Sequence, residues 1–104
     1  MSLRVAVSGA SGFVGRALVP LLSDRGCVVE PLGREVSALT PDDAVAQVAA
    51  FAPDVVLHLA THFLAAHTPA DIPDLVRTNV EWGTVLAEAA LAADARFVSI
   101  ESAW

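Results

Sequence analysis

Short runs of β-branched residues alternate with longer helical segments along the chain, and this alternation constrains the fold more than any other feature. The strand-like runs are 3–7, 27–32, 55–59 and 96–100, and the helical segments are 12–24, 41–51 and 71–93. Such an alternation is typical of an α/β domain with a parallel sheet. Because crossovers between parallel strands are right-handed, helices are expected on both faces of the sheet. The sequence therefore predicts a doubly wound parallel sheet.

The strand order is expected to follow the six-stranded doubly wound sheet, whose order is 3-2-1-4-5-6. With four strands this predicts the order 3-2-1-4, so that the run 96–100 forms an edge. That run suits a buried strand and makes a poor edge, because its unpaired backbone groups are open to other strands. We therefore interpret the chain as a sheet truncated after its fourth strand.

The composition agrees with a part of a larger domain. Apolar residues make up 55% and charged residues 17% of the 104 positions, whereas a soluble domain has about 45–50% and about 25%. No apolar run approaches the roughly 20 residues of a membrane-spanning helix. A net charge of −6 disfavours a nucleic-acid surface. Cys27 is the single cysteine and no signal peptide is expected, so the predicted compartment is the cytoplasm.

Within the helices, Thr40 and Pro41 form a helix start, and Pro20 is expected to bend the first helix or remove one of its bonds. The long helix carries apolar residues at helical spacing that predict its buried face: Ile72, Val76, Val80, Gly83, Ala87 and Ala90. Trp82 then points away from the sheet. Two interpretations of Trp82 stay open, packing against a neighbouring segment or a place in a helical dimer interface.

A glycine-rich segment, Ser-Gly-Ala-Ser-Gly-Phe-Val-Gly at 8–15, follows the first strand and opens the first helix. A dinucleotide site requires this context. Gly9 permits the tight turn, Gly12 lets the backbone approach a pyrophosphate, and Gly15 allows close packing of helix and sheet. The helix start offers free N–H groups to the phosphates. The candidate residues are Gly9, Ser11, Gly12, Phe13, Val14 and Gly15. Alternatively, the glycines serve only the turn.

The spacing G-x-x-G-x-x-G resembles that of the extended short-chain dehydrogenase/reductase superfamily, also called the NAD(P)-dependent epimerase/dehydratase family. The resemblance continues at His58-Leu59-Ala60, at Asn79-Val80 with Gly83-Thr84, and at Arg96-Phe97-Val98 followed by Ser102-Ala103. It implies a Rossmann-type domain with cofactor contacts at Leu59, Ala60, Thr61 and Asn79. The region from His58 to His67 looks most like sugar-nucleotide reductases and epimerases. The chain would then be the N-terminal half of the cofactor domain, without the substrate domain.

The tip of the second strand bears on the choice of cofactor. An acid at this tip binds the ribose hydroxyls of NAD, whereas an arginine accommodates the 2′-phosphate of NADP. Counting along the chain places the tip at Gly33-Arg34, and Glu30 lies in mid-strand. Arg34 without an acid at Gly33 favours NADP, with NAD possible; alternatively, Arg34 is a solvated loop residue. The resemblance also implies an Asp that binds adenine, where this chain has Ser37-Ala38-Leu39.

The resemblance implies catalysis by a Tyr-x-x-x-Lys pair, with a Ser or Thr that orients the substrate. The chain contains no tyrosine and no lysine. Ser102 is the candidate catalytic hydroxyl; alternatively, it is an ordinary strand-end serine. We therefore expect the NAD(P)-binding part of an oxidoreductase or epimerase for a nucleotide-sugar or a similar hydroxy/keto small molecule, catalytically incomplete alone. The alternative function is a nicotinamide-binding sensor without catalysis.

The remaining expectations concern metals and partners. His58 and His62 lie four residues apart, but His58 ends a strand and no Cys or Glu motif accompanies the pair, so no metal site is expected. His58 is interpreted as part of the cofactor wall. The expected protein partner is a second copy of the chain, bound through the long helix or through the exposed edge of the fourth strand.

Overall fold

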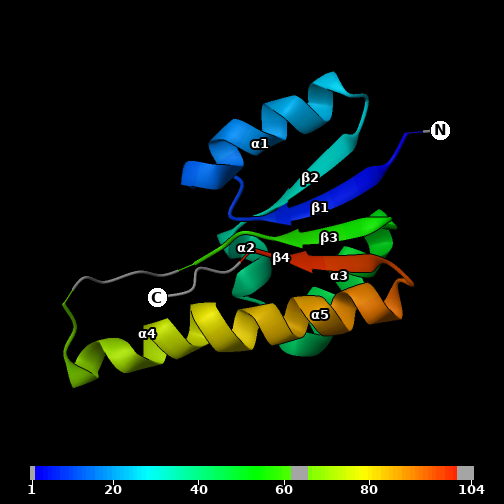
Figure 1. The fold of residues 1–104 in the computed structure, drawn as a ribbon. Helices are drawn as coiled ribbons and strands as arrows, with labels where there is room; N and C mark the ends of the chain where they lie inside the picture. The colour runs from blue at the N-terminus through cyan, green and yellow to red at the C-terminus, as the bar shows by residue number, and fades with distance from the viewer. Residues whose placement is uncertain (1, 62–65, 101–104) are drawn as a thin grey trace.

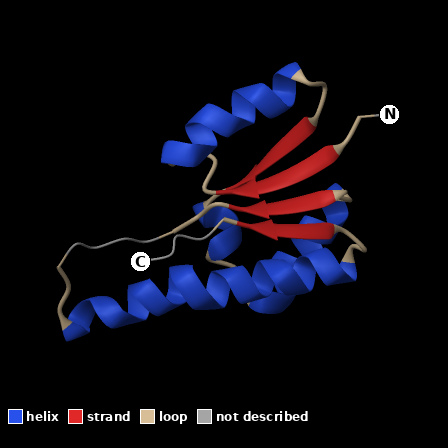
Figure 2. Ribbon diagram, viewed as in Figure 1, coloured by secondary structure: helices blue, strands red, loops and turns tan. Residues whose placement is uncertain are grey.

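In the computed structural model, which describes residues 2–61 and 66–100, four parallel strands form one sheet with helices on both faces (Figure 2). The strands are β1 (Arg4–Ser8), β2 (Val28–Leu32), β3 (Val55–His58) and β4 (Arg96–Ser99). The helices are α1 (Phe13–Asp24), α2 (Arg34–Ser37), α3 (Pro41–Phe51), α4 (Ile72–Val76) and α5 (Trp82–Ala92). A 3-10 turn, η1 (Pro69–Asp71), precedes α4, and a π turn, η2 (Arg77–Glu81), joins α4 to α5. The predicted α/β class is confirmed.

The two faces of the sheet carry two separate cores. Helix α1 covers one face, and α3 and α5 lie on the other (Figure 1). Because side chains alternate along a strand, Val5 and Val7 pack on the α1 side, whereas Ala6 packs with Val48 and Leu86 on the opposite side. The alternation thus divides each buried strand between the two layers.

The strand order is β2-β1-β3-β4, so the predicted order 3-2-1-4 is wrong. The third strand pairs with β1 instead of lying outside β2. The composition of β2 gives the reason: Glu30 and Pro31 are exposed, and a proline without an N–H suits an edge strand. Strand β3, with Val56 and Leu57 buried, belongs in the centre. Strand β4 forms the other edge, as expected.

This order creates a switch point between β1 and β3. The chain leaves β1 toward α1 and β2 on one side, and it leaves β3 toward α5 and β4 on the other. In open α/β sheets, ligands bind at the carboxyl ends of strands at such a point. The fold therefore places the candidate site where residues 9–15 follow β1 and residues 59–61 follow β3.

The predicted buried face of the long helix is wrong in its first half. Ile72, Val76 and Val80 are between 48% and 59% exposed. The buried side instead carries Trp82, Val85, Leu86, Ala89 and Ala90. The helix is apolar on several sides, so the spacing of apolar residues alone does not determine which face is buried. The larger apolar area of the Trp and Leu side chains gives a greater hydrophobic stabilisation when that face is buried.

Trp82 therefore belongs to the core of the chain. It is 4% exposed and lies in the same cluster as Ala6 and Val56 of the sheet. The prediction that it points away from the sheet is wrong, and of its two interpretations the structure supports packing within the chain.

Two helical features follow the sequence. The Thr40 hydroxyl accepts a hydrogen bond from the Asp43 N–H at 3.3 Å and caps α3. Pro20 lies inside α1, which continues past it to Asp24. Within the described ranges, no helix combines the length and the apolar character that crossing a membrane requires.

Candidate functional site

A cavity of about 610 Å³ lies at the carboxyl ends of β1, β2 and β3. It is lined by residues 9–15, 31–33, 37, 59–61, 77, 78 and 82. This volume is typical of sites for small molecules and cofactors, which measure about 300–1,000 Å³. Segments from four parts of the sequence therefore meet at the switch point of the sheet.

The glycine loop packs its backbone directly against neighbouring backbone. Gly9 has φ +74°, and a Cβ at this position would lie 2.6 Å from the Ala60 nitrogen. A Cβ at Gly15 would lie 2.3 Å from the Gly9 oxygen. A side chain at Gly9 would displace the loop from the end of β3, and one at Gly15 would push α1 away from the loop. Glycine is thus required at both.

The glycine loop places the first turn of α1 at the cavity. Gly12 is the N-cap residue, and Gly12, Phe13 and Val14 line the cavity. The first turn of α1 contains no acidic residue. The first N–H groups of a helix have no partner within it, and the helix dipole is positive at this end. The arrangement can therefore hold an anionic group such as a pyrophosphate.

A buried pair, Ser8 and His58, joins the ends of β1 and β3. The Ser8 hydroxyl lies 2.6 Å from His58 Nδ1, and it accepts hydrogen bonds from the N–H groups of Leu59 at 3.1 Å and Ala60 at 3.2 Å. Because the backbone groups can only donate, the single hydroxyl proton goes to Nδ1, and the imidazole proton lies on Nε2. Burial lowers the pKa of His58, which keeps the ring neutral.

Ser8 and His58 hold the residues of the cavity wall in place but are not themselves part of the wall. His58 stacks on Phe97 with 6.4 Å between ring centroids and is not among the lining residues. The wall consists of the next three residues, Leu59, Ala60 and Thr61. The interpretation of His58 as part of the cofactor wall is therefore wrong. Its ring points into the layer between sheet and helix because β3 alternates.

The structure brings together most of the residues predicted for the cofactor. Nine of them line the cavity: Gly9, Ser11, Gly12, Phe13, Val14, Gly15, Leu59, Ala60 and Thr61. Asn79 is exposed on η2 and is not among the lining residues. Arg34 follows Gly33 in the backbone, at the start of α2. Ser102 lies outside the described residues. The roles assigned to these residues stay predictions.

Several residues at this site were not predicted. The Glu35 carboxylate accepts a hydrogen bond from the Gly33 N–H at 3.3 Å, so an acid does lie at the tip of β2. A search for an acid at Gly33 itself misses it, because the side chain reaches back from α2. Ser37, Arg77, Thr78 and Trp82 also line the cavity. Ser37 stands where the resemblance implies an Asp that binds adenine, so the sequence marked this position, whereas it gave no signal for Arg77 or Thr78.

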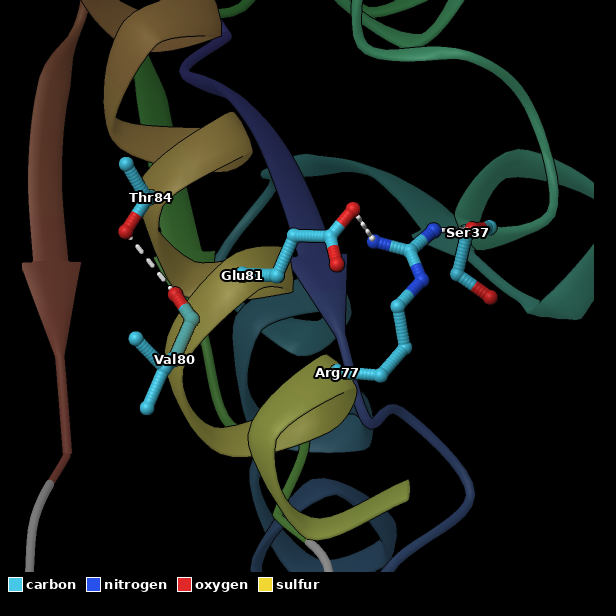
Figure 3. A network of polar contacts seen from close by, with 5 residues as sticks. All are labelled: Ser37, Arg77, Val80, Glu81 and Thr84. Carbon is cyan, nitrogen blue, oxygen red and sulfur yellow. Dashed lines mark hydrogen bonds and ion pairs between the residues drawn. The ribbon is translucent and has the colours of Figure 1, made fainter. Parts of the chain in front are cut away.

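Arg77 connects two walls of the cavity (Figure 3). Its Nη2 donates to the Ser37 carbonyl, and its Nη1 forms an ion pair with Glu81 at 3.0 Å. The end of α2 is thereby tied to the π turn. Among residues 2–61 and 66–100, no three His, Cys, Asp or Glu side chains lie together as metal ligands. His62 lies outside these ranges, and His67 is exposed.

A parallel sheet with a glycine loop and a cavity at its switch point defines a Rossmann-type domain of the kind that holds a dinucleotide. The chain matches the NAD dependent epimerase/dehydratase family over residues 5–104 and belongs to this family. The resemblance found in the sequence is thus confirmed.

Individual proteins extend the comparison. The 3-diazoavenalumate denitrifying reductase of a Streptomyces species is 33% identical, over 96% of this chain and 38% of that protein. The structure of dTDP-4-dehydrorhamnose reductase from Bacillus anthracis in complex with NADP gives a TM-score of 0.80 at 18% identity, over 93% of this chain and 35% of that one. The structure of a short-chain dehydrogenase/reductase superfamily protein from Agrobacterium tumefaciens with bound NAD gives a TM-score of 0.70 at 30% identity. The match covers 95% of this chain and 32% of that one. The chain therefore spans about a third of the length of these proteins.

Proposed function

We propose that the chain is the NAD(P)-binding part of an oxidoreductase or epimerase that acts on a nucleotide-sugar or a similar hydroxy/keto compound. The observation that carries this proposal is the start of α1, delivered by the glycine loop to a cavity at the switch point. In this proposal residues 1–104 form the N-terminal half of the cofactor domain, and the substrate domain belongs to another part of the protein. When bound, the cofactor supplies a hydride or accepts one.

The lining residues fit such a cofactor. The start of α1 would hold the pyrophosphate, because it offers N–H groups and carries no acid in its first turn. The tip of β2 at Gly33 would hold the adenosine ribose. Leu59, Ala60 and Thr61 would form the wall at the end of β3. Each role follows from the place of the residue in the cavity.

Two neighbouring residues favour different cofactors. Arg34 supports NADP, because an arginine near the ribose accommodates a 2′-phosphate. The carboxylate of Glu35 at Gly33 supports NAD, because it can accept from ribose hydroxyls and repels a phosphate. Glu35 weakens the preference for NADP that the sequence suggested, so binding of both cofactors has to be measured.

The reductases among the similar proteins support reductase chemistry in this proposal. One relative is a denitrifying reductase and one structural neighbour is a dTDP-4-dehydrorhamnose reductase. Within the proposal Ser102 orients the substrate, and the general acid/base comes from outside these residues, since the chain has no tyrosine and no lysine. A sensor module is the alternative function. A Tyr-x-x-x-Lys pair encoded downstream of Trp104 supports the enzyme, and its absence supports the sensor.

Two further proposals concern assembly and compartment. We propose a homodimer, formed through the exposed apolar side of α4 and η2 or through the free edge of β4. The half-buried, free Cys27 accords with a reducing cytoplasm.

Substitution of Gly12 tests the proposed function. A Cβ at Gly12 would lie 3.3 Å from the Gly9 oxygen, a tight contact that requires a small shift of the loop, and it would enter the space proposed for the pyrophosphate. Gly12→Ala should therefore weaken binding of NADPH or NADH at least about tenfold, or about 1.4 kcal/mol, as measured by isothermal titration. Ser23→Ala is the control, since Ser23 is exposed near the end of α1 and is not among the lining residues of the cavity. Equal affinities of the two variants would refute the proposed site.

A further inference from the structure

The cavity continues past the part that the glycine loop surrounds. With the pyrophosphate at the start of α1, the ribose at the end of β2 and residues 59–61 as the wall at β3, the lining residues left without a role are Ser37, Arg77, Thr78 and the nearly buried Trp82. None of them belongs to the glycine loop or to β2. The group that extends beyond the ribose must therefore meet the wall made by α2 and the π turn.

Arg77 dominates this wall, and its side chain is held in a fixed orientation. Its guanidinium donates from Nη2 to the Ser37 carbonyl and pairs through Nη1 with the Glu81 carboxylate at 3.0 Å (Figure 3). The two contacts hold the planar group at two of its nitrogens. The Arg77 side chain is 34% exposed and that of Glu81 is 51% exposed. With its nitrogens engaged, the guanidinium presents mainly its flat face to a ligand.

The local backbone supports a ligand-binding role. Trp82 N–H donates to the Arg77 carbonyl, five residues back, which makes this turn a π turn. Such turns are rare and are frequent at functional sites. Nη1 is buried and, among the described residues, has no hydrogen-bond partner beyond its ion pair with Glu81. The guanidinium is thus held between the Ser37 carbonyl and the Glu81 carboxylate, at a π turn that borders the cavity.

The charges around Arg77 select between two kinds of ligand group. Its positive charge is already compensated by Glu81, and that carboxylate would repel a second anion at the same place. A phosphate is therefore a poor ligand for this guanidinium. A neutral aromatic ring suits it, because guanidinium planes stack on aromatic faces and on nucleobases.

We propose that Arg77 is a specificity-determining residue whose guanidinium forms the platform on which the adenine base of the cofactor stacks, with Ser37 and Glu81 fixing its plane. This inference rests on the proposed cofactor function and extends it to the base. Arg77 then acts equally on NADP and NAD, which share adenine, while Arg34 and Glu35 act on the ribose that differs between them.

Titrations with NADPH, NADH and reduced nicotinamide mononucleotide, which lacks the adenosine, test this inference. Arg77→Met keeps the stem of the side chain and removes its plane, and Arg77→Lys keeps the charge without the plane. Both variants should weaken binding of NADPH and NADH by a similar factor, about five- to thirtyfold. Affinity for the mononucleotide should not change. Arg25→Met, an exposed arginine beyond the end of α1, is the matched control.

The outcomes separate this inference from the proposed function. If the unsubstituted chain binds neither dinucleotide, the proposed function is wrong and the inference falls with it. If it binds them and the Arg77 variants bind equally well, only the role of Arg77 is refuted. A loss confined to NADPH would identify a contact with the 2′-phosphate and would also refute stacking on the base. Circular dichroism verifies folding, and Arg77→Lys carries the test if the methionine variant does not fold.

Discussion

At the scale of single residues, the pair Ser8 and His58 shows how buried polar groups define the site. One hydroxyl joins the imidazole to two backbone N–H groups and so fixes the ends of β1 and β3 relative to each other. A buried polar group without such partners would destabilise the fold by about 1–3 kcal/mol. The same pair makes the stability of the chain depend on pH.

Burial lowers the pKa of His58 in the folded chain below its ordinary value of 6.5. As the pH falls below 6.5, the unfolded chain therefore binds more protons than the folded chain. The contribution of His58 to the free energy of unfolding decreases until the pH reaches the lower pKa of the folded chain. Above 6.5 this contribution is constant. Urea unfolding of the chain and of His58→Gln should show the advantage of the native residue shrinking between about pH 7.5 and about pH 5.5.

The exposed residue His67 provides the control for this measurement. His67→Gln makes the same chemical change at an exposed position, so an effect found only in His58→Gln is assigned to the buried site. Parallel stability curves for the native chain and His58→Gln across this range would contradict a neutral, buried imidazole.

The residues of the site differ in how far the sequence could reveal them. Gly9 and Gly15 were predictable, because close backbone contacts require glycine and leave it at fixed spacing. Glu35 and Arg77 were not, because their long side chains contact backbone groups away from their own positions: Gly33, two residues back in the same turn, and Ser37, forty residues away. Local sequence patterns therefore predict where the backbone requires glycine better than they predict which group a long side chain contacts.

At the scale of elements, the sequence predicted the positions of the strands and of most helices, but it did not predict which strands lie side by side in the sheet. Periodicity measures local burial and is the same wherever a strand is inserted in a sheet. The exposed Pro31 in β2 carried the missing information, since it marks an edge. The prediction for the long helix was wrong for another reason. Its apolar residues lie on several sides, and the side with the larger side chains, here Trp82 and Leu86, is the one that is buried.

The cap of α3 gives a prediction at this scale. Thr40→Ala removes the oxygen that accepts from the Asp43 N–H, and it should lower the free energy of unfolding by about 0.5–2 kcal/mol in urea denaturation. Thr40→Ser keeps the oxygen and should retain most of the stability. Neither variant should alter cofactor affinity, since Thr40 is not among the lining residues of the cavity. A Ser variant as unstable as the Ala variant would show that the hydroxyl does not cap the helix.

At the scale of the whole molecule, the apolar excess of the sequence now has a location. Exposed apolar residues gather on the outer side of α4 and η2, at Ile72, Val76 and Val80, and on β4 with its continuation, at Val98 and Ile100. The chain spans between 32% and 38% of the proteins compared with it. Contiguous apolar patches on a protein surface mark places where another surface binds.

For the homodimer that we propose, the three helix residues offer a better interface than the edge of β4. They follow one another at intervals of four and are each about half exposed, so they form one stripe along the helix. A two-fold dimer can bury this stripe against itself, because the same surface serves both copies. Sedimentation velocity should therefore show concentration-dependent dimers that Val76→Glu or Val80→Glu abolishes. Val98→Lys on β4 should leave the dimer intact; a dimer lost only in that variant would place the interface on the strand edge instead.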